Sequence, residues 1–289
     1  MKKIGIIGNG FVGSSVSFGF SPQTGCDGVD IKIYDKDESN ATHTMSEVVN
    51  DSDVIFVSVP TPSNTDGSIN LDIVYDVFNN IEKCREEGSE PVLLLRSTVT
   101  PGTTRKLQIG FHNLRIVFNP EFLTERSAKL DFINQSRFVL GGNVVDTTIV
   151  AELYKWRFGQ HIPVIKTDYE TAELIKYMNN TFFATKVSFM NEMKLVSDEV
   201  GANWEHCVEG FSLDGRVGHS HLNVPGPDGK MGYGGSCFPK DIQAMINFMN
   251  RMGVSPNVLE GSWKTNLEVR PEEDWKELKG RAVVDEQEI

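Results

Sequence analysis

The sequence has 289 residues, of which 39% are hydrophobic and 24% charged, and its formal net charge is −12 at pH 7. This length favours two domains, and the composition is that of a soluble globular protein. The negative charge argues against a surface for nucleic acid or anionic membrane, so we expect neither as a partner. The four cysteines show no CxxC spacing, and no apolar run resembles a signal peptide or a membrane span. We therefore expect a cytoplasmic protein with reduced thiols and no metal site.

The first half of the chain alternates short apolar runs with polar helical stretches. The runs are KKIGIIG, IKIYD, DVIFVSVP, PVLLLRST and LRIVFNP. Their regular alternation with helical segments predicts the parallel strands of a doubly wound α/β sheet.

A glycine motif follows the first of these strands. GNGFVG places Gly8, Gly10 and Gly13 in GxGxxG spacing, and Asp35 closes the next strand about 20 residues further on. The glycines allow backbone N–H groups to approach a pyrophosphate at a helix N-terminus, and the carboxylate can accept from a ribose hydroxyl. Asp35 would repel a 2′-phosphate and so favours NAD over NADP, although Lys36 weakens that inference. A glycine turn without a ligand is the structural alternative.

The pattern changes to a helical period near Asp168. Apolar residues three, four or seven apart form one stripe: Ile175, Met178, Phe182, Phe189, Met193, Val196 and Val200. They predict a long helix, the spine of a mainly helical domain that we place at residues 169–270. Residues 210–236 are rich in Gly, Ser, His and Pro and predict a long functional loop, and PEEDWKELK predicts a short solvated helix.

A single cysteine stands in GGSCFPKD, residues 234–241. Pro239 and the apolar spacing after it predict a helix that begins just beyond Cys237. The helix N-terminus and Lys240 would both stabilise a thiolate, and Gly234 and Gly235 would leave room for a substrate. The alternative is a buried, inert thiol, since free cysteines are among the most commonly buried residues.

GGSCFPKD and the glycine motif together resemble the UDP-glucose and GDP-mannose dehydrogenase family. Further blocks match in order: VPTP at 59–62, STVTPGT at 97–103, NPEFLTE at 119–125, AELIKYMNN at 172–180 and DGRVG at 214–218. The family oxidises a nucleotide-sugar alcohol to a carboxylate with two NAD. The resemblance implies a Rossmann NAD-binding domain over 1–168, a helical central and dimerisation domain over 169–270, a homodimer, and a substrate such as UDP-glucose.

The resemblance also implies roles for individual residues. Cys237 would capture the intermediate aldehyde as a thiohemiacetal, which a second hydride transfer converts to a thioester. The other catalytic residues would be Lys176 and Asn180 for oxyanions, Asp241 and Thr98 for water, and Glu125 for thioester hydrolysis. Besides the glycines, Asp35 and Lys36, the cofactor would contact Phe11, Val12, Val59, Pro60, Thr61, Ser97, Thr98, Glu125 and Lys240. The substrate would contact Glu121, Phe122, Leu123, Lys176, Asn180, Gly234, Gly235, Cys237 and Arg216, the last of which can come from a neighbouring subunit or only pair with Asp214.

The chain departs from the family pattern at its end. LKGRAVV, 278–284, looks like the first strand of the family's third domain, which holds much of the nucleotide, and we interpret 271–289 as a truncated start of it. A partner chain could supply the missing surface. Two other functions stay open: a β-hydroxy-acid dehydrogenase, which needs no thiol, and a non-catalytic NAD-binding partner of a full-length homologue.

Overall fold

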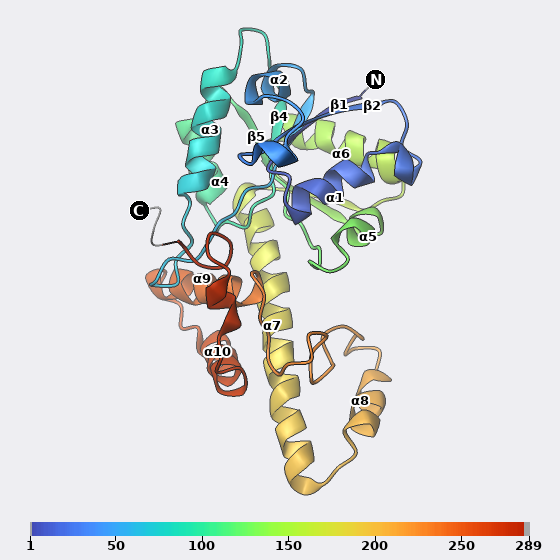
Figure 1. The fold of residues 1–289 in the computed structure, drawn as a ribbon, viewed down its shortest axis with the longest axis vertical. Coiled ribbons are helices and arrows are strands. Elements are labelled where there is room, and N and C mark those ends of the chain that lie inside the picture. The colour runs from blue at the N-terminus through green and yellow to red at the C-terminus, as the bar shows by residue number, and fades with distance from the viewer. Residues whose placement is uncertain (1, 286–289) are drawn as a thin grey trace. The chain divides into compact units, whose positions relative to one another are not determined.

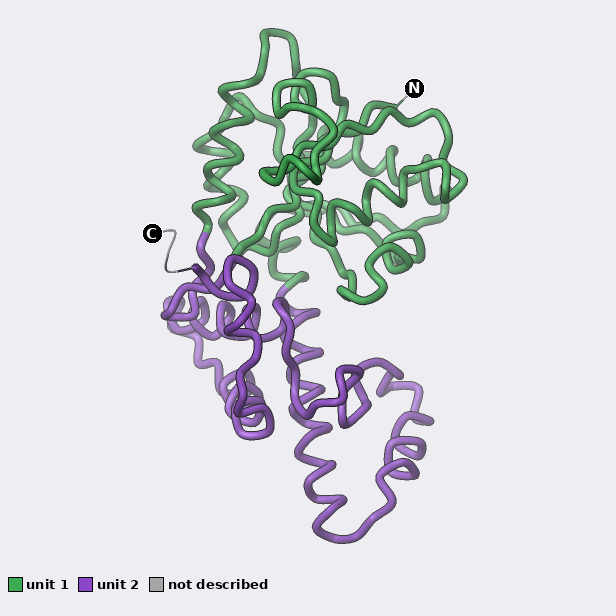
Figure 2. The backbone as a smooth tube through the Cα atoms, in the orientation of Figure 1, with its two compact units in different colours: residues 1–61, 71–176 green, residues 62–70, 177–289 purple. Residues whose placement is uncertain are grey.

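The computed structural model describes residues 2–285 and divides the chain into two compact units (Figure 2). Unit 1 comprises residues 1–61 and 71–176. Unit 2 comprises residues 62–70 and 177–289. Helix α7 (Tyr169–Val200) is continuous and contributes residues to both units.

Unit 1 is built on a seven-stranded sheet (Figure 1). The strands are β1 (Lys2–Ile7), β2 (Val29–Tyr34), β3 (Val54–Val57), β4 (Val92–Leu95), β5 (Arg115–Phe118), β6 (Phe138–Gly141) and β7 (Val164–Thr167), in the order β2-β1-β3-β4-β5-β6-β7. The first five are the strands predicted from the apolar runs, and they pair in parallel. β6 and β7 were not predicted. β6 runs antiparallel to β5, and β7 is parallel to β6, so the sheet is mostly rather than wholly parallel.

Helices cover both faces of this sheet. They are α1 (Phe11–Gly19), α2 (Met45–Asn50), α3 (Asp72–Cys84), α4 (Thr103–Gly110), α5 (Ala128–Ile133) and α6 (Val144–Phe158), with the 3₁₀ turns η1 (Pro22–Thr24) and η2 (Glu38–Asn40). Successive strand residues pack into two different hydrophobic cores. On β3, Ile55 packs on the side of α2, α3 and α4, and Phe56 packs on the side of α1, α5 and α6. Helices on both faces of the sheet confirm the doubly wound α/β prediction. A sheet buried on both faces needs apolar residues at every strand position, which is why the strands read as apolar runs.

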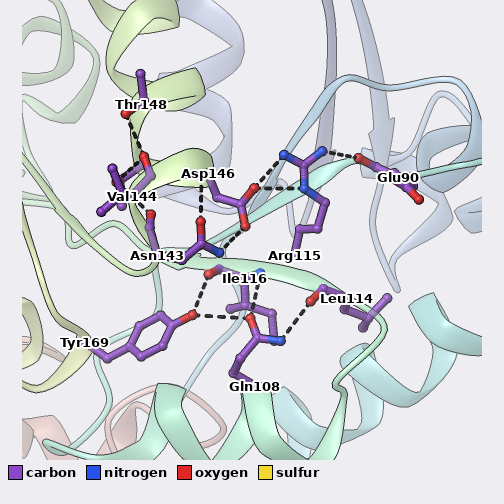
Figure 3. Close-up of polar contacts among 11 residues, drawn as sticks. Glu90, Gln108, Leu114, Arg115, Ile116, Asn143, Val144, Asp146, Thr148 and Tyr169 are labelled. Atoms are coloured by element: carbon purple, nitrogen blue, oxygen red, sulfur yellow. Dashed lines mark hydrogen bonds and ion pairs between the residues drawn. The ribbon is translucent and has the colours of Figure 1, made fainter.

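Polar side chains join the starts of α6 and α7 to β5 (Figure 3). The Arg115 guanidinium on β5 donates from Nε and Nη2 to Asp146 on α6, at 2.8 and 2.5 Å, and Asn143 caps the start of that helix. The Tyr169 hydroxyl at the start of α7 donates to the Ile116 carbonyl. Arg115, Asn143, Asp146 and Tyr169 border an open cavity of about 480 Å³ in unit 1, and each of them already makes the hydrogen bonds described above. Within residues 2–285, none of the predicted site residues lines it.

Unit 2 is mainly helical. Besides the later part of α7 it contains α8 (Trp204–Ser212), α9 (Phe238–Arg251), α10 (Asn257–Val269) and the 3₁₀ turn η3 (Asp274–Glu277). The predicted long helix is confirmed, but within unit 2 α7 buries Tyr177, Ala184 and Met190. The predicted apolar stripe from Met178 to Val200 faces outward, with Met178 and Phe182 more than 60% exposed.

Two predictions for the C-terminal part differ from the structure in detail. PEEDWKELK forms a 3₁₀ turn instead of a solvated helix, because Trp275 is buried with its ring 5.3 Å from that of Trp263. Residues 278–284 form isolated bridges rather than a strand, through Val283 to Ser63 and Lys279, and Ala282 is buried. This segment therefore packs within unit 2.

Candidate active site

The glycine turn has the geometry that a dinucleotide requires. Gly8 has φ +87°, and a Cβ on Gly13 would lie 2.0 Å from the Gly8 carbonyl oxygen, so both positions need glycine. A Cβ on Gly10, the N-cap of α1, would meet nothing within 4 Å. There is thus space beside Gly10 at the start of α1, the end of a helix that favours a phosphate.

Asp35 lies directly after β2 and is held beside this turn. Its carboxylate accepts from the Asn9 amide nitrogen at 2.5 Å and from the Asp37 amide at 2.9 Å. The buried Asn9 Oδ1 has no hydrogen-bond partner among the described residues. Asn9 occupies a variable position of GxGxxG, so the motif gave no reason to select it. The turn, the open Gly10 and the carboxylate together fit the pyrophosphate and ribose of a dinucleotide.

The loops after β3 and β4 are joined by their predicted cofactor residues. Ser97 Oγ accepts from the Val59 amide at 3.0 Å and donates to the Val59 carbonyl at 2.6 Å. Thr61 Oγ1 donates to the Thr98 carbonyl at 3.0 Å. These bonds fix both loops at the carboxyl edge of the sheet, the edge at which α/β proteins bind ligands.

Lys176 is buried and paired inside unit 1. Its Nζ donates to the Glu121 carbonyl at 2.7 Å and to Glu121 Oε1 at 2.8 Å, and it lies 5.6 Å from the centre of the Phe122 ring. Glu121 Oε2 accepts from the Leu123 amide at 2.6 Å. Residues 119–124 form a loop, so Glu121 and Glu125 do not share a helix, and Glu125 is exposed. The structure brings together Lys176, Glu121, Phe122 and Leu123 as a single polar cluster.

Asn119 anchors the loop that carries Glu121. It is fully buried, and its Oδ1 accepts from Arg96 Nη1 at 2.6 Å and from the Tyr154 hydroxyl at 2.5 Å, while its Nδ2 donates to the Val139 carbonyl. Burial raises the pKa of Tyr154 to about 12, so its hydroxyl stays protonated as a donor. Neither Arg96 nor Tyr154 could be selected from the sequence, because their partners are distant in the chain.

Glu173 is a second buried group that no sequence pattern predicted. It lies one turn before Lys176 on α7, and its carboxylate accepts from the Gly102 and Thr104 amides at 2.6 and 2.7 Å and from Thr104 Oγ1 at 2.6 Å. It thereby satisfies amide donors at the start of α4. Glu173 ties the loop that contains Thr98 to the helix that carries Lys176.

Glu173 should make the stability of the chain depend on pH. Burial raises the pKa of its carboxyl from 4.5 to about 7, although its hydrogen bonds act in the opposite direction. The folded chain therefore binds this proton more tightly than the unfolded chain, and the contribution to stability is lost as the pH rises through that window. We expect it to lower the free energy of unfolding by about 2 to 3 kcal/mol. Urea unfolding from pH 4.5 to 7.5 should show a smaller pH dependence for Glu173→Gln than for the unaltered chain; parallel profiles would contradict this assignment.

Cys237 is the N-cap residue of α9 in unit 2, as predicted, and Pro239 lies in the first turn of that helix. Its thiol is half-buried, and Sγ lies 3.8 Å from Ser236 Oγ as a hydrogen-bond pair. Cys237 therefore stands at the positive end of a 14-residue helix, and its side chain makes no capping hydrogen bond there.

Three further predicted residues form a buried network beside the start of α9. Asn180 Nδ2 donates to Asp241 Oδ2 at 2.6 Å, and the Lys240 ammonium donates to Asp241 Oδ1. All three side chains are buried. The Lys240 charge is thus balanced by Asp241, and the Asp241 carboxylate has a defined orientation.

Arg216 and the two glycines before Cys237 have different surroundings. The Arg216 side chain is 90% exposed and pairs with Asp214, as the structural alternative had it. Gly235 has φ +70° and open space at its Cβ position. A Cβ on Gly234 would lie 2.5 Å from Arg270 Nη2, so this glycine makes room for a protein side chain.

The chain is similar to known proteins over most of its length. The NAD binding domain model of the UDP-glucose/GDP-mannose dehydrogenase family matches residues 32–157, and that family's central domain model matches residues 170–268. A UDP-glucose 6-dehydrogenase of Haloferax volcanii is 30% identical over 91% of this chain and 69% of its own length. The chain belongs to the UDP-glucose/GDP-mannose dehydrogenase family. Its Rossmann fold is also that of a UDP-glucose dehydrogenase structure from Pyrobaculum islandicum, at TM-score 0.80 and 26% identity over 93% of this chain and 68% of that one.

Family membership makes NAD the cofactor of unit 1, in agreement with the glycine turn and Asp35. The UDP-glucose 6-dehydrogenase of Rickettsia prowazekii is 34% identical over 82% of this chain and 54% of its own length. The chain spans about half the length of several such curated relatives. Across residues 2–285 no helix combines the length and apolar character that a bilayer crossing needs.

Proposed function

We propose that this chain catalyses the NAD-dependent oxidation of a nucleotide sugar at C6, from alcohol to carboxylate, through a thioester on Cys237. The observation that carries the proposal is the half-buried thiol at the N-terminus of α9, followed by the buried Lys240–Asp241–Asn180 network. Relatives named UDP-glucose 6-dehydrogenase support UDP-glucose or a similar compound as the substrate.

The covalent steps follow from the chemistry of a thiolate. When bound, NAD accepts one hydride in each of two oxidations. The Cys237 thiolate adds to the aldehyde carbon made by the first oxidation, forming a C–S bond and, after protonation of the oxygen, a thiohemiacetal. Loss of a hydride from that carbon and of the hydroxyl proton gives the thioester. Water then adds to the thioester carbon, and the C–S bond breaks to release the acid and the thiol.

The remaining residues stabilise charge and handle water. We assign the ammonium of Lys176, oriented by Glu121, and the amide of Asn180 to the oxyanions that form on the substrate. Asp241 accepts from both of its neighbours and is assigned, with Thr98, to position water, while Glu125 assists hydrolysis. Arg216 is assigned to the substrate, and its exposure is compatible with a contribution to a neighbouring subunit.

The NADH yield tests this function directly. Purified protein supplied with NAD and a panel of UDP- and GDP-linked sugars should form two NADH per molecule of acid, and thiol alkylation should stop the reaction. One NADH per turnover of a small hydroxy acid, insensitive to alkylation, would instead identify a β-hydroxy-acid dehydrogenase. Tight NAD binding without any turnover, together with co-purification of a longer homologue, would identify a non-catalytic partner.

The outward face of α7 supports a homodimer. Met178, Phe182, Phe189, Val196 and Val200 expose apolar side chains along one helix. An exposed apolar face of this kind is typical of a protein contact. Light scattering at micromolar concentration should give the mass of a dimer, and Phe182→Asp should shift it toward the monomer. A monomeric mass for the unaltered chain would contradict the dimer and any action of Arg216 across subunits. We propose the cytoplasm as the location, and a partner chain as a source of further substrate contacts.

A further inference from the structure

We infer that two side chains of α10, Asn266 and Arg270, are positioning residues for Cys237. They hold the backbone of residues 232–234, which leads into the thiol, and they act on the reaction only through that loop. The inference rests on the proposed thioester function. It concerns contacts within unit 2 alone.

The Asn266 side chain hydrogen-bonds both backbone groups of one loop residue, Tyr233. Its side-chain Oδ1 accepts from the Tyr233 amide at 2.7 Å, and its Nδ2 donates to the Tyr233 carbonyl at 3.1 Å. Asn266 is fully buried, and Gly232 presses against it, since a Cβ there would lie 2.5 Å from Asn266 Oδ1. On the α7 side, Asn191 Oδ1 accepts from the Gly232 amide at 2.9 Å. A primary amide used in this way replaces the backbone partner that a strand would supply.

Arg270 supports the next part of the loop. Its guanidinium is buried and donates to Asp274 at 2.9 and 2.7 Å, to Asp228 at 2.8 Å and to the Met231 carbonyl at 3.3 Å. A Cβ on Gly234 would lie between 2.5 and 2.9 Å from three atoms of this guanidinium. Gly234 therefore lies directly against the guanidinium, and the planar group sets the path of the chain two residues before Ser236.

The support from α10 matters because the loop has no regular secondary structure to hold it. Residues 213–236 contain no helix or strand, so side chains must satisfy and orient the backbone. Cys237 comes three residues after Gly234 and is the N-cap of α9. A loop that moves carries the sulfur away from the carbon it attacks, and a displacement of about 1 Å at a reacting atom can cost about 100-fold in rate.

The kinetic test compares variants on the two sides of α10. Asn266→Ala should lower kcat for acid formation about 100-fold and leave the KM for NAD unchanged, because the glycine turn belongs to unit 1. Asn266→Asp keeps the acceptor for the Tyr233 amide and, when protonated, a donor for the Tyr233 carbonyl, so relative to the unaltered chain part of that loss should return as the pH falls. Lys264→Met is the matched control, since Lys264 lies on the same helix with its side chain 80% exposed, and it should behave like the unaltered chain.

A second measurement does not depend on turnover. Iodoacetamide alkylation followed by peptide mass spectrometry compares Cys237 with the exposed Cys207, which serves as a reference in the same chain. Loss of the Asn266 bonds should raise the rate at Cys237 about tenfold relative to Cys207, because the loop opens more often. Arg270→Lys keeps the positive charge that Asp228 and Asp274 require but loses the planar set of N–H donors. It should therefore also raise the alkylation rate at Cys237. If Asn266→Ala does not fold, Arg270→Lys serves as the test variant.

The outcomes separate this inference from the proposed function. Folded variants that keep both the alkylation ratio and kcat of the unaltered chain would overturn the positioning role. An equal fall in stability and activity, with the alkylation ratio unchanged, would also overturn it by showing a purely structural role. If the unaltered chain oxidises no nucleotide sugar, the proposed function fails, while the alkylation ratio still decides whether Asn266 and Arg270 position the thiol.

Discussion

Replacing Cys237 with serine should abolish acid formation from a nucleotide sugar, with a loss of at least about 1,000-fold in kcat. A serine hydroxyl at the same N-cap position is a far weaker nucleophile than a thiolate and does not form the thioester. The first oxidation does not need the sulfur, so a small amount of aldehyde and a single NADH per product are still expected. Product analysis by mass spectrometry together with the NADH yield measures both steps.

Cys207→Ser is the control for this variant. Cys207 is exposed on α8, and its removal should leave the rate and the NADH yield unchanged. Full acid formation by Cys237→Ser would reject the covalent mechanism. A loss shared equally by Cys237→Ser and Cys207→Ser would indicate a nonspecific effect of removing thiols.

Replacing Lys176 with methionine should reduce both activity and stability. The loss of a positive charge near the developing oxyanion should lower kcat by about 100- to 1,000-fold. The free energy of unfolding should fall by about 3 to 5 kcal/mol, because the buried Glu121 carboxylate loses the ammonium 2.8 Å away. Denaturant unfolding and steady-state kinetics measure the two effects independently.

A double variant separates the two roles of Lys176. Lys176→Met combined with Glu121→Gln removes the uncompensated charge, so most of the lost stability should return while activity stays low. Recovery of activity along with stability would mean that Lys176 only holds the loop in place. No recovery of stability would mean that the Lys176–Glu121 pair does not explain the loss.

Much of the fold was predictable from local patterns. The first five strands and α7 follow from runs and periods within a few turns of chain, and the helix start at Cys237 follows from Pro239. β6 and β7 escaped prediction although β3, β4 and β5 are equally short. β7 is an edge strand without a fully buried residue, and the reversed direction of β6 depends on its pairing with β5. The 3₁₀ turn at Trp275 escaped for a similar reason, since the burial of that ring against Trp263 outweighs the polar pattern around it.

The predicted site residues were chosen largely by motif, and the structure adds what holds them. Lys176 with Glu121, and Asn180 with Asp241, are pairs of motif residues that the structure joins within one unit or the other. Their supports were not in any motif: Asn119 is held by Arg96, and the Cys237 loop by Asn266. A buried amide or arginine has no characteristic local spacing, because its partners come from other elements.

The sequence by itself determined the chemistry available to this protein: a glycine turn with its acid, a thiol at a helix start, and a set of family motifs in order. These depend on residues close together in the chain, where spacing and backbone preference are sufficient. Only the tertiary structure decided that Glu173 binds the start of α4, 71 residues from Gly102, that α7 turns its apolar stripe outward, and that Gly234 makes room for Arg270. Packing between distant segments sets such contacts, and no local pattern records which segments will meet.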